Sequence, residues 1–527
     1  MNRPYPPAIR TLLLLAPALA LAAGPAHALQ LHQGEIDGQR KDGVTRYLGI
    51  PYAGAPVGEH RWRAPLPAPS WSGTLHADHF AANCQQAPAP KAFRAWTSEY
   101  LIEGPISEDC LYLNVWSPAG GDVSGAKVAT ALPVLVWIHG GGFTSGGATV
   151  PVYDGQALAA KGVVVVSINY RLGVYGFLSH AALRGENPEH ASGNYGLLDQ
   201  IAALRWVREN IAAFGGDPQR VTVAGQSAGA ASVHDLIASP LAHGLFQRAI
   251  AESGSGMGGA LPDGAASDAV GAQLLAKAAA ADVAALRKLP AAQLDAAAVG
   301  LSFRPNIDGR VLPDASFEGR NTNDVPMLTG LTADEGSSMS PTYGQATPAS
   351  FAAALAQRYG ALAPAFARAY PAASKQQAGA SAKQLVRDRG LASTWQWAKT
   401  RMATSPQPIY LYYFTHVEPG PEAQRYGAFH SSEIPYVFAT LDRSERPFSA
   451  QDRALSHTIG QYWVNWIRSG DPNGPGLPAW PRLRPDAARM LEIGTHSQAR
   501  PILPPEKLSL FERTIAQGGR LGLFPQD

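Results

Sequence analysis

The chain has 527 residues, of which 43 are basic and 41 acidic, so its formal net charge is +2. Nucleic-acid-binding proteins need a basic face or tail, so this balance argues against a nucleic-acid partner. Hydrophobic residues make up 46% of the chain and charged residues 16%, which excludes an extended disordered protein or a coiled coil. A chain of this length buries a large core without depending on cysteine bridges.

The N-terminus has the parts of a secretory signal peptide. Arg3 and Arg10 supply positive charge at the start. Thr11–Ala23 is an apolar stretch, and Ala26-His27-Ala28 fits an A-x-A cleavage site. The apolar stretch is too short for a membrane span, which needs about 20 residues, and no later apolar run is long enough either. We predict that residues 1–28 are cleaved and that the mature protein is exported to the periplasm or the extracellular space.

Export also bears on the two cysteines. In an oxidising compartment Cys84 and Cys110 are expected to form one disulfide, worth about 3 kcal/mol in the chain-entropy model. Two free buried thiols are the alternative. Two cysteines cannot build a Cys-rich zinc site, and no H-E-x-x-H sequence occurs in the chain. The sequence therefore implies no metal and no other cofactor.

Between residues 133 and 254, apolar strand-like runs alternate with a helix-like segment. Val134–Ile138 and Gly162–Ile168 are too apolar for half-exposed strands, so we expect a parallel sheet covered on both faces. Leu197–Phe214 places its apolar residues on one helical stripe, and Val221–Ala224 begins another strand. This β-α-β order predicts a doubly wound α/β fold with its ligand crevice at the carboxyl ends of the strands.

A candidate nucleophile follows the strand that begins at Val221. Gly225–Gly229 reads G-x-S-x-G with Ser227 at its centre, and the helical run Ala230–Ile237 comes next. The tight turn between strand and helix needs small residues on both sides of the serine, and the helix N-terminus offers free N–H groups. In this strand–turn–helix context the pattern predicts a serine nucleophile.

A second glycine-rich segment follows the strand Val134–Ile138. His139–Phe143 contains three consecutive glycines, which is compatible with a merely flexible turn. Because glycines also let backbone N–H groups approach a reacting carbonyl closely, the segment is typical of an oxyanion loop. Its occurrence upstream of the G-x-S-x-G turn favours the oxyanion loop.

With these two motifs and the stretches given below, the chain resembles the type-B carboxylesterases, the cholinesterase-like branch of the α/β-hydrolase fold. The resemblance implies an α/β fold with a mostly parallel central sheet, helices on both faces, and one catalytic domain over residues 29–527. It also supports the bridge between Cys84 and Cys110, because the family's first disulfide ends at the same Ser-Glu-Asp-Cys sequence. The matching stretches are Tyr47–Ala53, Ser107–Asn114, Asn194–Gln200, Phe214–Pro218 and Gly470–Gly474.

The resemblance implies the remaining catalytic residues. Glu335 lies in a segment similar to the family's acidic motif, with its neighbour Asp334 as the competing acid. His430 lies in a segment similar to the histidine motif, so the order of nucleophile, acid and base along the chain is that of the α/β-hydrolases. In this family, His430 would act as the base for Ser227 and Glu335 would orient it.

The same resemblance makes the backbone N–H groups of Gly141, Gly142 and Ala228 the expected oxyanion-hole donors. With these parts the chain would hydrolyse a small-molecule carboxylic ester through an acyl-enzyme intermediate. Only 95 positions separate the acid from the histidine, a short stretch for this family, which argues against a large interfacial lid.

Three residues are expected to contact substrate. Gln226 stands where many relatives, cholinesterases included, have a glutamate, so a cationic substrate would lose a favourable interaction and neutral esters fit better. Tyr100, or Trp96 beside it, would line the pocket mouth, although a packed loop aromatic is an equal alternative. Leu301, and with it Val299, lies just upstream of Phe303–Gly309, a segment similar to the one that follows the acyl pocket in this family. The resemblance therefore implies that they line a roomy acyl pocket, the alternative being simple core packing.

The sequence thus predicts an exported serine carboxylesterase acting on neutral esters. A non-catalytic binding protein on the same fold is the alternative of a different class, and it is disfavoured because the triad and the glycine loop are complete. Within the enzyme class a lipase, a thioesterase or a specialised detoxifying esterase stays open, since specificity depends on the shape of the pocket. The pattern indicates no oligomeric state.

Overall fold

The computed structural model describes residues 28–88, 93–118, 131–313, 323–420 and 422–523. The proposed signal peptide, residues 1–28, lies outside these ranges except for its last residue. No helix in the part of the chain that is described is long and apolar enough to cross a membrane.

The described residues form one 13-stranded sheet in the order β1-β2-β3-β7-β9-β8-β10-β11-β12-β13-β14-β15, with β4 beside β2, and a separate pair β5-β6. The strands are β1 (Leu29–Gln30), β2 (Glu35–Lys41), β3 (Val44–Pro51), β4 (Thr74–Ala77), β5 (Asn83–Cys84), β6 (Ile106–Ser107), β7 (Tyr112–Pro118), β8 (Leu132–Ile138), β9 (Val164–Ile168), β10 (Gly216–Gln226), β11 (Arg248–Glu252), β12 (Met327–Thr332), β13 (Ile409–Phe414), β14 (Arg489–Ile493) and β15 (Gln498–Pro501).

The central part of the sheet is parallel. Strands β9, β8, β10, β11, β12, β13 and β14 lie side by side in that order, and each adjacent pair among them is parallel. The antiparallel pairs lie toward the edges, where β1, β2, β3 and β7 form one side and β15 closes the other. The parallel core brings the carboxyl ends of β8 and β10 to the same edge, as the sequence predicted.

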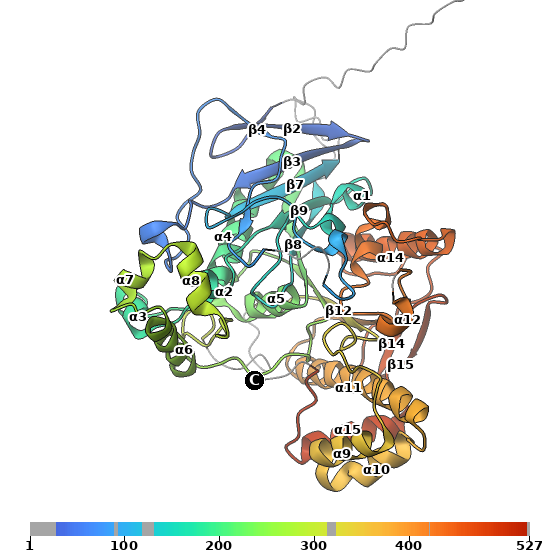
Figure 1. Cartoon of the computed structure of the whole chain (residues 1–527). Coiled ribbons are helices and arrows are strands. Elements are labelled where there is room, and N and C mark those ends of the chain that lie inside the picture. The colour runs from blue at the N-terminus through green and yellow to red at the C-terminus, as the bar shows by residue number, and fades with distance from the viewer. Residues whose placement is uncertain (1–27, 89–92, 119–130, 314–322, 421, 524–527) are drawn as a thin grey trace, which may run out of the picture.

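Alternate side chains of the central strands enter two different hydrophobic clusters. In β8, Leu135 and Trp137 belong to one cluster, whereas Val134, Val136 and Ile138 belong to the other. Since successive side chains of a strand point to opposite faces, both faces of the sheet are buried. Helices α11 and α14 pack into the first cluster and α4 and α5 into the second, so helices flank the sheet on both sides (Figure 1).

The helices connect and cover the strands as Figure 1 shows. They are α1 (Gln156–Ala159), α2 (Gly173–Phe177), α3 (Ala181–Glu186), α4 (Tyr195–Asn210), α5 (Ala228–Ala238), α6 (Gly264–Lys277), α7 (Val283–Arg287), α8 (Ala291–Ala298), α9 (Pro348–Tyr359), α10 (Ala363–Ala369), α11 (Lys375–Thr404), α12 (Ala423–Tyr426), α13 (Ile434–Phe438), α14 (Ala450–Ser469) and α15 (Pro505–Ala516).

The elements predicted from the sequence are present with small shifts at their ends. The helix predicted over Leu197–Phe214 is observed as α4 followed by a 3-10 turn, Ile211–Phe214. Gly215 ends this turn at φ 78°, a left-handed conformation that a residue without a Cβ adopts at little cost. The strand predicted from Val221 begins earlier, at Gly216, with a register irregularity before Val221.

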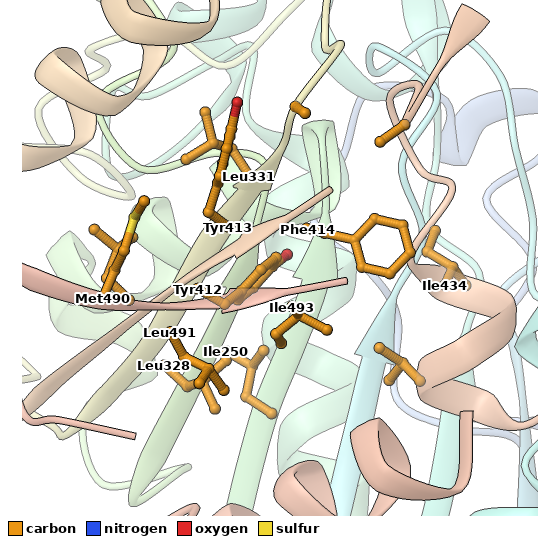
Figure 2. Packing of buried hydrophobic residues seen from close by; sticks show 14 of the residues in the cluster. Ile250, Leu328, Leu331, Tyr412, Tyr413, Phe414, Ile434, Met490, Leu491 and Ile493 are labelled. Carbon is orange, nitrogen blue, oxygen red and sulfur yellow. The ribbon is translucent and has the colours of Figure 1, made fainter. Parts of the chain in front are cut away.

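One hydrophobic cluster continues across the strands toward the segment of the predicted histidine. Ile250 of β11, Leu328 of β12, Tyr412 of β13 and Leu491 of β14 come from neighbouring strands, and Ile434 of α13 belongs to the same cluster (Figure 2). Ile434 is fully buried and lies four positions after the predicted histidine. The loop that carries this histidine is therefore anchored on the sheet by apolar packing.

The predicted disulfide is present and joins Cys84 to Cys110, with their Cα atoms 4.9 Å apart. Both cysteines are buried, and the alternative of two free thiols is wrong. The bridge ties β5 to the start of β7, so it closes the base of the segment between them. That segment contains the aromatic residues that the sequence analysis placed at the pocket mouth.

Candidate active site

Ser227 lies in the sharp turn between β10 and α5. Its backbone has φ 58° and ψ −121°, a conformation that side chains other than glycine rarely adopt. A Cβ on Gly229 would lie 2.1 Å from the carbonyl oxygen of Ile138, and one on Gly225 would lie 2.5 Å from the Gly229 backbone. The two glycines of the G-x-S-x-G pattern are thus required by close packing of the turn on β8.

The glycine loop after β8 packs against this turn. A Cβ on Gly140 would lie 2.8 Å from the Gln226 carbonyl oxygen and 3.1 Å from the Cβ of Ser227. Gly141 and Gly142 have φ of 107° and 64°, which glycine tolerates. Among the described residues, none accepts a hydrogen bond from the backbone N–H of Gly141, Gly142 or Ala228. These three groups remain available to a ligand oxygen.

His139, which begins the glycine loop, has a supporting position that the sequence analysis missed. Its ring is buried, stacks on Tyr170 with centroids 4.5 Å apart, and has Nδ1 2.8 Å from the Gly140 carbonyl oxygen. Burial lowers the pKa of His139 to about 4, so the imidazole is neutral at physiological pH. The stacked ring fixes the start of the loop, and only the packing reveals this.

Glu335 and His430 are in direct contact. A hydrogen bond joins His430 Nδ1 to Glu335 Oε2, and both side chains are 2% exposed. The other carboxylate oxygen of Glu335 accepts hydrogen bonds from Ser253 Oγ at 2.6 Å and from the Thr332 N–H at 2.8 Å. Burial lowers the pKa of His430, but the Glu335 carboxylate outweighs burial and holds this pKa above the ordinary histidine value.

Gln226 contacts the other side of the same imidazole. Its amide nitrogen lies 3.1 Å from His430 Nε2. An amide nitrogen can only donate, so the contact fits an imidazole whose proton is on Nδ1, facing Glu335. In that tautomer Nε2 carries the lone pair that a general base needs.

The competing acid, Asp334, has other partners. Its carboxylate accepts hydrogen bonds from Arg387, from the Tyr343 hydroxyl at 2.9 Å and from the Ala428 N–H at 3.1 Å. The Asp334 side chain is 3% exposed and forms an ion pair with Arg387. The two adjacent acids therefore face different surroundings, and it is Glu335 that contacts the histidine.

A cavity of about 520 Å³ contains Ser227 and His430 in its wall. Tyr100, Trp96 and Gln226 also line it, so these predicted substrate contacts are brought to the site. The complete lining is Gln86, Ala87, Pro88, Phe93, Arg94, Trp96, Tyr100, Leu101, Ile102, Gly140, Gly141, Gly142, Ser145, Gly146, Val150, Tyr153, Gln226, Ser227, Ser338, Met339, His430 and Ser431.

Two residues predicted for the acyl pocket are elsewhere. Leu301 is partly buried against the hydrophobic cluster that contains α4 and α5, and it is not part of the cavity wall. Val299 is 69% exposed. The sequence analysis located these positions only by distance from a family segment, and the fold turns them toward the side of α8. Leu301 therefore packs against the hydrophobic core, which was the alternative interpretation.

The cavity wall has a partly aromatic side supplied by the disulfide-closed segment. The Trp96 indole N–H donates to the His430 carbonyl oxygen at 3.2 Å, and its ring stacks on Phe93. The Tyr100 hydroxyl donates to Glu418 at 2.9 Å, which in turn faces Arg446. Tyr100 is thus held in place from behind, with its ring exposed to the cavity.

Two further acids, which the sequence analysis did not single out, lie buried near the histidine. Glu252 accepts a hydrogen bond from the Trp463 indole at 2.8 Å, and Glu433 accepts one from the Tyr412 hydroxyl at 3.1 Å. Burial raises the pKa of Glu252 to about 8. Burial, together with the nearby Glu252 and Glu335, raises the pKa of Glu433 well above its ordinary value. A glutamate at the end of an otherwise apolar strand was the available signal for Glu252.

Proteins of known activity resemble this chain over most of its length. The model of the carboxylesterase family matches residues 25–511. The chain is 38% identical over 503 residues to a fumonisin B1 esterase of Sphingopyxis macrogoltabida, covering 90% of this chain and 88% of that protein. It is 37% identical over 486 residues to a para-nitrobenzyl esterase of Bacillus subtilis (87% and 93%). Among solved structures, the carboxylesterase EST55 of Geobacillus stearothermophilus matches with a TM-score of 0.77 at 33% identity, covering 92% of this chain and 99% of that one.

Proposed function

This chain belongs to the carboxylesterase family and is a carboxylic-ester hydrolase of the α/β-hydrolase fold, and from that premise we propose that Ser227, His430 and Glu335 are its catalytic triad. One observation carries the proposal. His430 contacts Glu335 and lines the same cavity as Ser227, whose backbone is strained. Membership of a hydrolase family sets aside the non-catalytic alternative.

In the proposed mechanism, His430 Nε2 takes the Ser227 proton as the serine oxygen attacks the ester carbonyl. The proton on Nδ1 stays hydrogen-bonded to Glu335, which stabilises the imidazolium as it forms. The protonated His430 then gives its proton to the leaving alcohol, and an acyl group remains on Ser227. Water, deprotonated by the same histidine, attacks the acyl-enzyme and releases the acid.

The developing oxyanion needs donors that are already in place. We assign this task to the backbone N–H groups of Gly141, Gly142 and Ala228, which have no acceptor among the described residues. The N-terminal end of α5 adds a favourable dipole at the same point. One donor of this kind is worth about 10²–10³ in turnover.

The cavity supports a neutral ester group at the serine. Gln226 carries no charge where many relatives have a carboxylate, and the described part of the wall contains no Asp or Glu. A cationic alcohol such as choline would therefore find no counter-charge beside the serine. We assign carboxylic esters of short to medium chain length, without a charged group beside the ester, as substrates, with Tyr100 and Trp96 as wall contacts.

We also propose that the enzyme is exported. The Cys84–Cys110 disulfide supports this, because such bridges persist in oxidising compartments. The signal peptide itself rests on the sequence of residues 1–28.

The decisive test is hydrolysis of p-nitrophenyl esters from acetate to palmitate by residues 29–527, with Ser227→Ala beside the unaltered chain. We expect turnover that peaks at short or medium chains and falls by at least about 10⁴-fold in the variant. The exposed Ser72→Ala is the matched control and should behave as wild type. A peak at long chains would replace the proposal with a lipase, and turnover that survives in Ser227→Ala would remove the serine from the mechanism.

A further inference from the structure

Among the described residues that line the catalytic cavity, one side chain carries a permanent charge. None of them is Asp, Glu or Lys, and Arg94 is the single arginine. His430 is the other group in this part of the wall that can become a cation, and in the proposed mechanism it does so only when it takes the serine proton. The wall otherwise consists of glycine, aromatic, aliphatic and neutral polar residues.

Arg94 is held in the wall by a tight turn. The backbone N–H of Phe93 donates to the Trp96 carbonyl at 2.8 Å, and the Trp96 N–H donates back at 3.0 Å. Arg94 itself has φ 58°, so the turn holds it in a left-handed conformation. Its guanidinium lies 5.2 Å from the centre of the Phe93 ring. The side chain is exposed, but its position is set by the turn.

The positive charge of Arg94 is not neutralised by its neighbours. One guanidinium nitrogen donates to the carbonyl oxygens of Ser338 at 2.7 Å and Met339 at 2.6 Å. Carbonyls carry no net charge, and no carboxylate of the described residues lies within ion-pair distance of Arg94. A guanidinium has five N–H donors, so donors remain for a ligand.

The other charged groups near the cavity are compensated. Arg446, behind Tyr100, is paired with Glu99 at 2.9 Å and lies 3.4 Å from Glu418. Glu335 is paired with His430. Glu252 and Glu433 do not line the cavity, and burial raises the pKa of both, which disfavours their charged forms. Among the described residues, Arg94 is therefore the charge that an incoming substrate meets.

We propose that the cavity prefers esters that carry a free carboxylate several bonds from the scissile carbonyl, and that Arg94 binds this carboxylate. The inference rests on the proposed function, which requires only that the ester group at Ser227 be neutral. Arg94, Trp96 and Ser227 line the same cavity, and Trp96 donates a hydrogen bond to the carbonyl oxygen of His430. An ester bound at Ser227 therefore shares this cavity with the Arg94 guanidinium.

The test compares charged and neutral esters of equal length. The acyl-side series is the monomethyl esters of adipic, pimelic and suberic acids against methyl esters of the corresponding alkanoic acids, followed by release of methanol. The alcohol-side series is carboxyalkyl butyrates against alkyl butyrates. The quantity measured is the ratio of kcat/KM for the anionic ester to that for its neutral partner.

We expect the ratio to fall by about fivefold to tenfold in Arg94→Gln in at least one series, as for an exposed charge pair. Arg94→Lys should restore part of it, and Arg368→Gln, an exposed arginine of α10 outside the cavity, should leave it unchanged. Raising the ionic strength should lower the wild-type ratio toward that of Arg94→Gln. The series that responds identifies the side of the ester that carries the carboxylate.

The two proposals fail in different ways. If wild type hydrolyses neutral esters and the ratio is the same in Arg94→Gln in both series, the role of Arg94 is overturned and the esterase proposal stands. If folded wild type hydrolyses no ester of either charge, the proposed function is overturned and this inference with it. Loss of Arg94 contacts to Ser338 and Met339 would affect both esters of a pair alike, so a structural effect cancels in the ratio.

Discussion

Two cavities of similar size lie on opposite sides of the loop that follows β12, and they differ in charge. The catalytic cavity, about 520 Å³, is lined by glycine, aromatic and aliphatic residues with one arginine. The second cavity, about 570 Å³, is lined by Ala333 and Asp334 and by several other charged side chains. Its charged wall residues are Asp334, Lys383, Arg387, Asp388, Glu492, Arg500 and Lys507.

Most of the charges in the second cavity are already used by the protein itself. Arg387 pairs with Asp334, Lys507 with Asp388, and Arg500 with Glu492. In the catalytic cavity, by contrast, Arg94 has no charged partner and the N–H groups of Gly141 and Gly142 have no acceptor among the described residues. The difference indicates that cavity size alone does not mark a candidate site, whereas uncompensated charges and free N–H groups do.

The two adjacent acids of this loop also differ in their partners. Asp334 contacts Arg387, whereas its neighbour Glu335 contacts His430. Substitutions that remove one charge at a time can break or sharpen this comparison.

The largest effect is expected for Glu335→Gln. Without the carboxylate the imidazolium that forms during attack is no longer stabilised, and Nδ1 loses the partner that holds its proton. We expect kcat to fall by about 10³–10⁴-fold. Turnover of p-nitrophenyl butyrate measures the change, with circular dichroism to show that the variant is folded. A Glu335→Gln enzyme of near wild-type rate would contradict the assignment of the acid.

Asp334→Asn should instead reduce stability. It removes the buried partner of Arg387 but keeps the size of the side chain and its ability to accept from Ala428. Because Arg387 is 32% exposed, we expect a loss of about 2–3 kcal/mol rather than the larger cost of a fully buried pair. Urea denaturation measures this loss. Turnover should change by less than about tenfold, and abolished turnover in a folded Asp334→Asn would reverse the roles of the two acids.

The pH dependence of turnover gives a third distinction. His430 must be neutral to accept the serine proton, and its pKa is held above the ordinary histidine value by Glu335 against the opposing effect of burial. Activity is therefore expected to be lost as the pH falls through this raised pKa. In Glu335→Gln only the smaller effect of Glu433 still opposes burial, so the pKa of His430 should fall and the acid limb of the kcat/KM profile should move to lower pH.

The Asp334→Asn variant is the control for this profile, because Asp334 is paired with Arg387 and does not contact the imidazole. Its acid limb should coincide with that of wild type. A shift of equal size in both variants would mean that the whole loop, and not the Glu335 carboxylate, sets the pKa of His430.

The smallest effect is expected deep in the second cavity, for Arg500→Gln. This substitution removes an ion pair with Glu492 whose side chains are 29% and 25% exposed. Such pairs contribute less than about 1 kcal/mol, so the melting temperature should change little and turnover not at all. A marked loss of turnover in this variant would show that the second cavity is coupled to the first.

Much of the fold and of the candidate site could be predicted from the sequence, because they depend on local patterns. The apolar runs of β8 and β9 and the stripe of α4 follow from hydrophobic periodicity, and the turn at Ser227 follows from its flanking glycines. The resemblance to the family then supplied Glu335 and His430, which no local pattern would have distinguished from other acids and histidines.

The prediction failed where position depends on how distant segments pack. Leu301 was expected in the cavity but packs outside its wall. His139, Glu252 and Glu433 were not singled out, since their shifted pKa values come from burial by residues far apart in the chain. Arg94 was also missed, because an arginine in a loop carries no signal until its neighbours are known.

The sequence by itself determined the class of protein, the order of the strands and helices around Ser227, and the residues able to form a triad. Only the tertiary structure decided which of two adjacent acids meets His430, which aromatic side chains wall the cavity, and which charge is left without a partner. The physical reason is that backbone conformation and apolar periodicity are set by neighbours along the chain. Burial, pKa and charge compensation are instead set by neighbours in space, such as Glu335 and His430, which lie 95 positions apart in the chain.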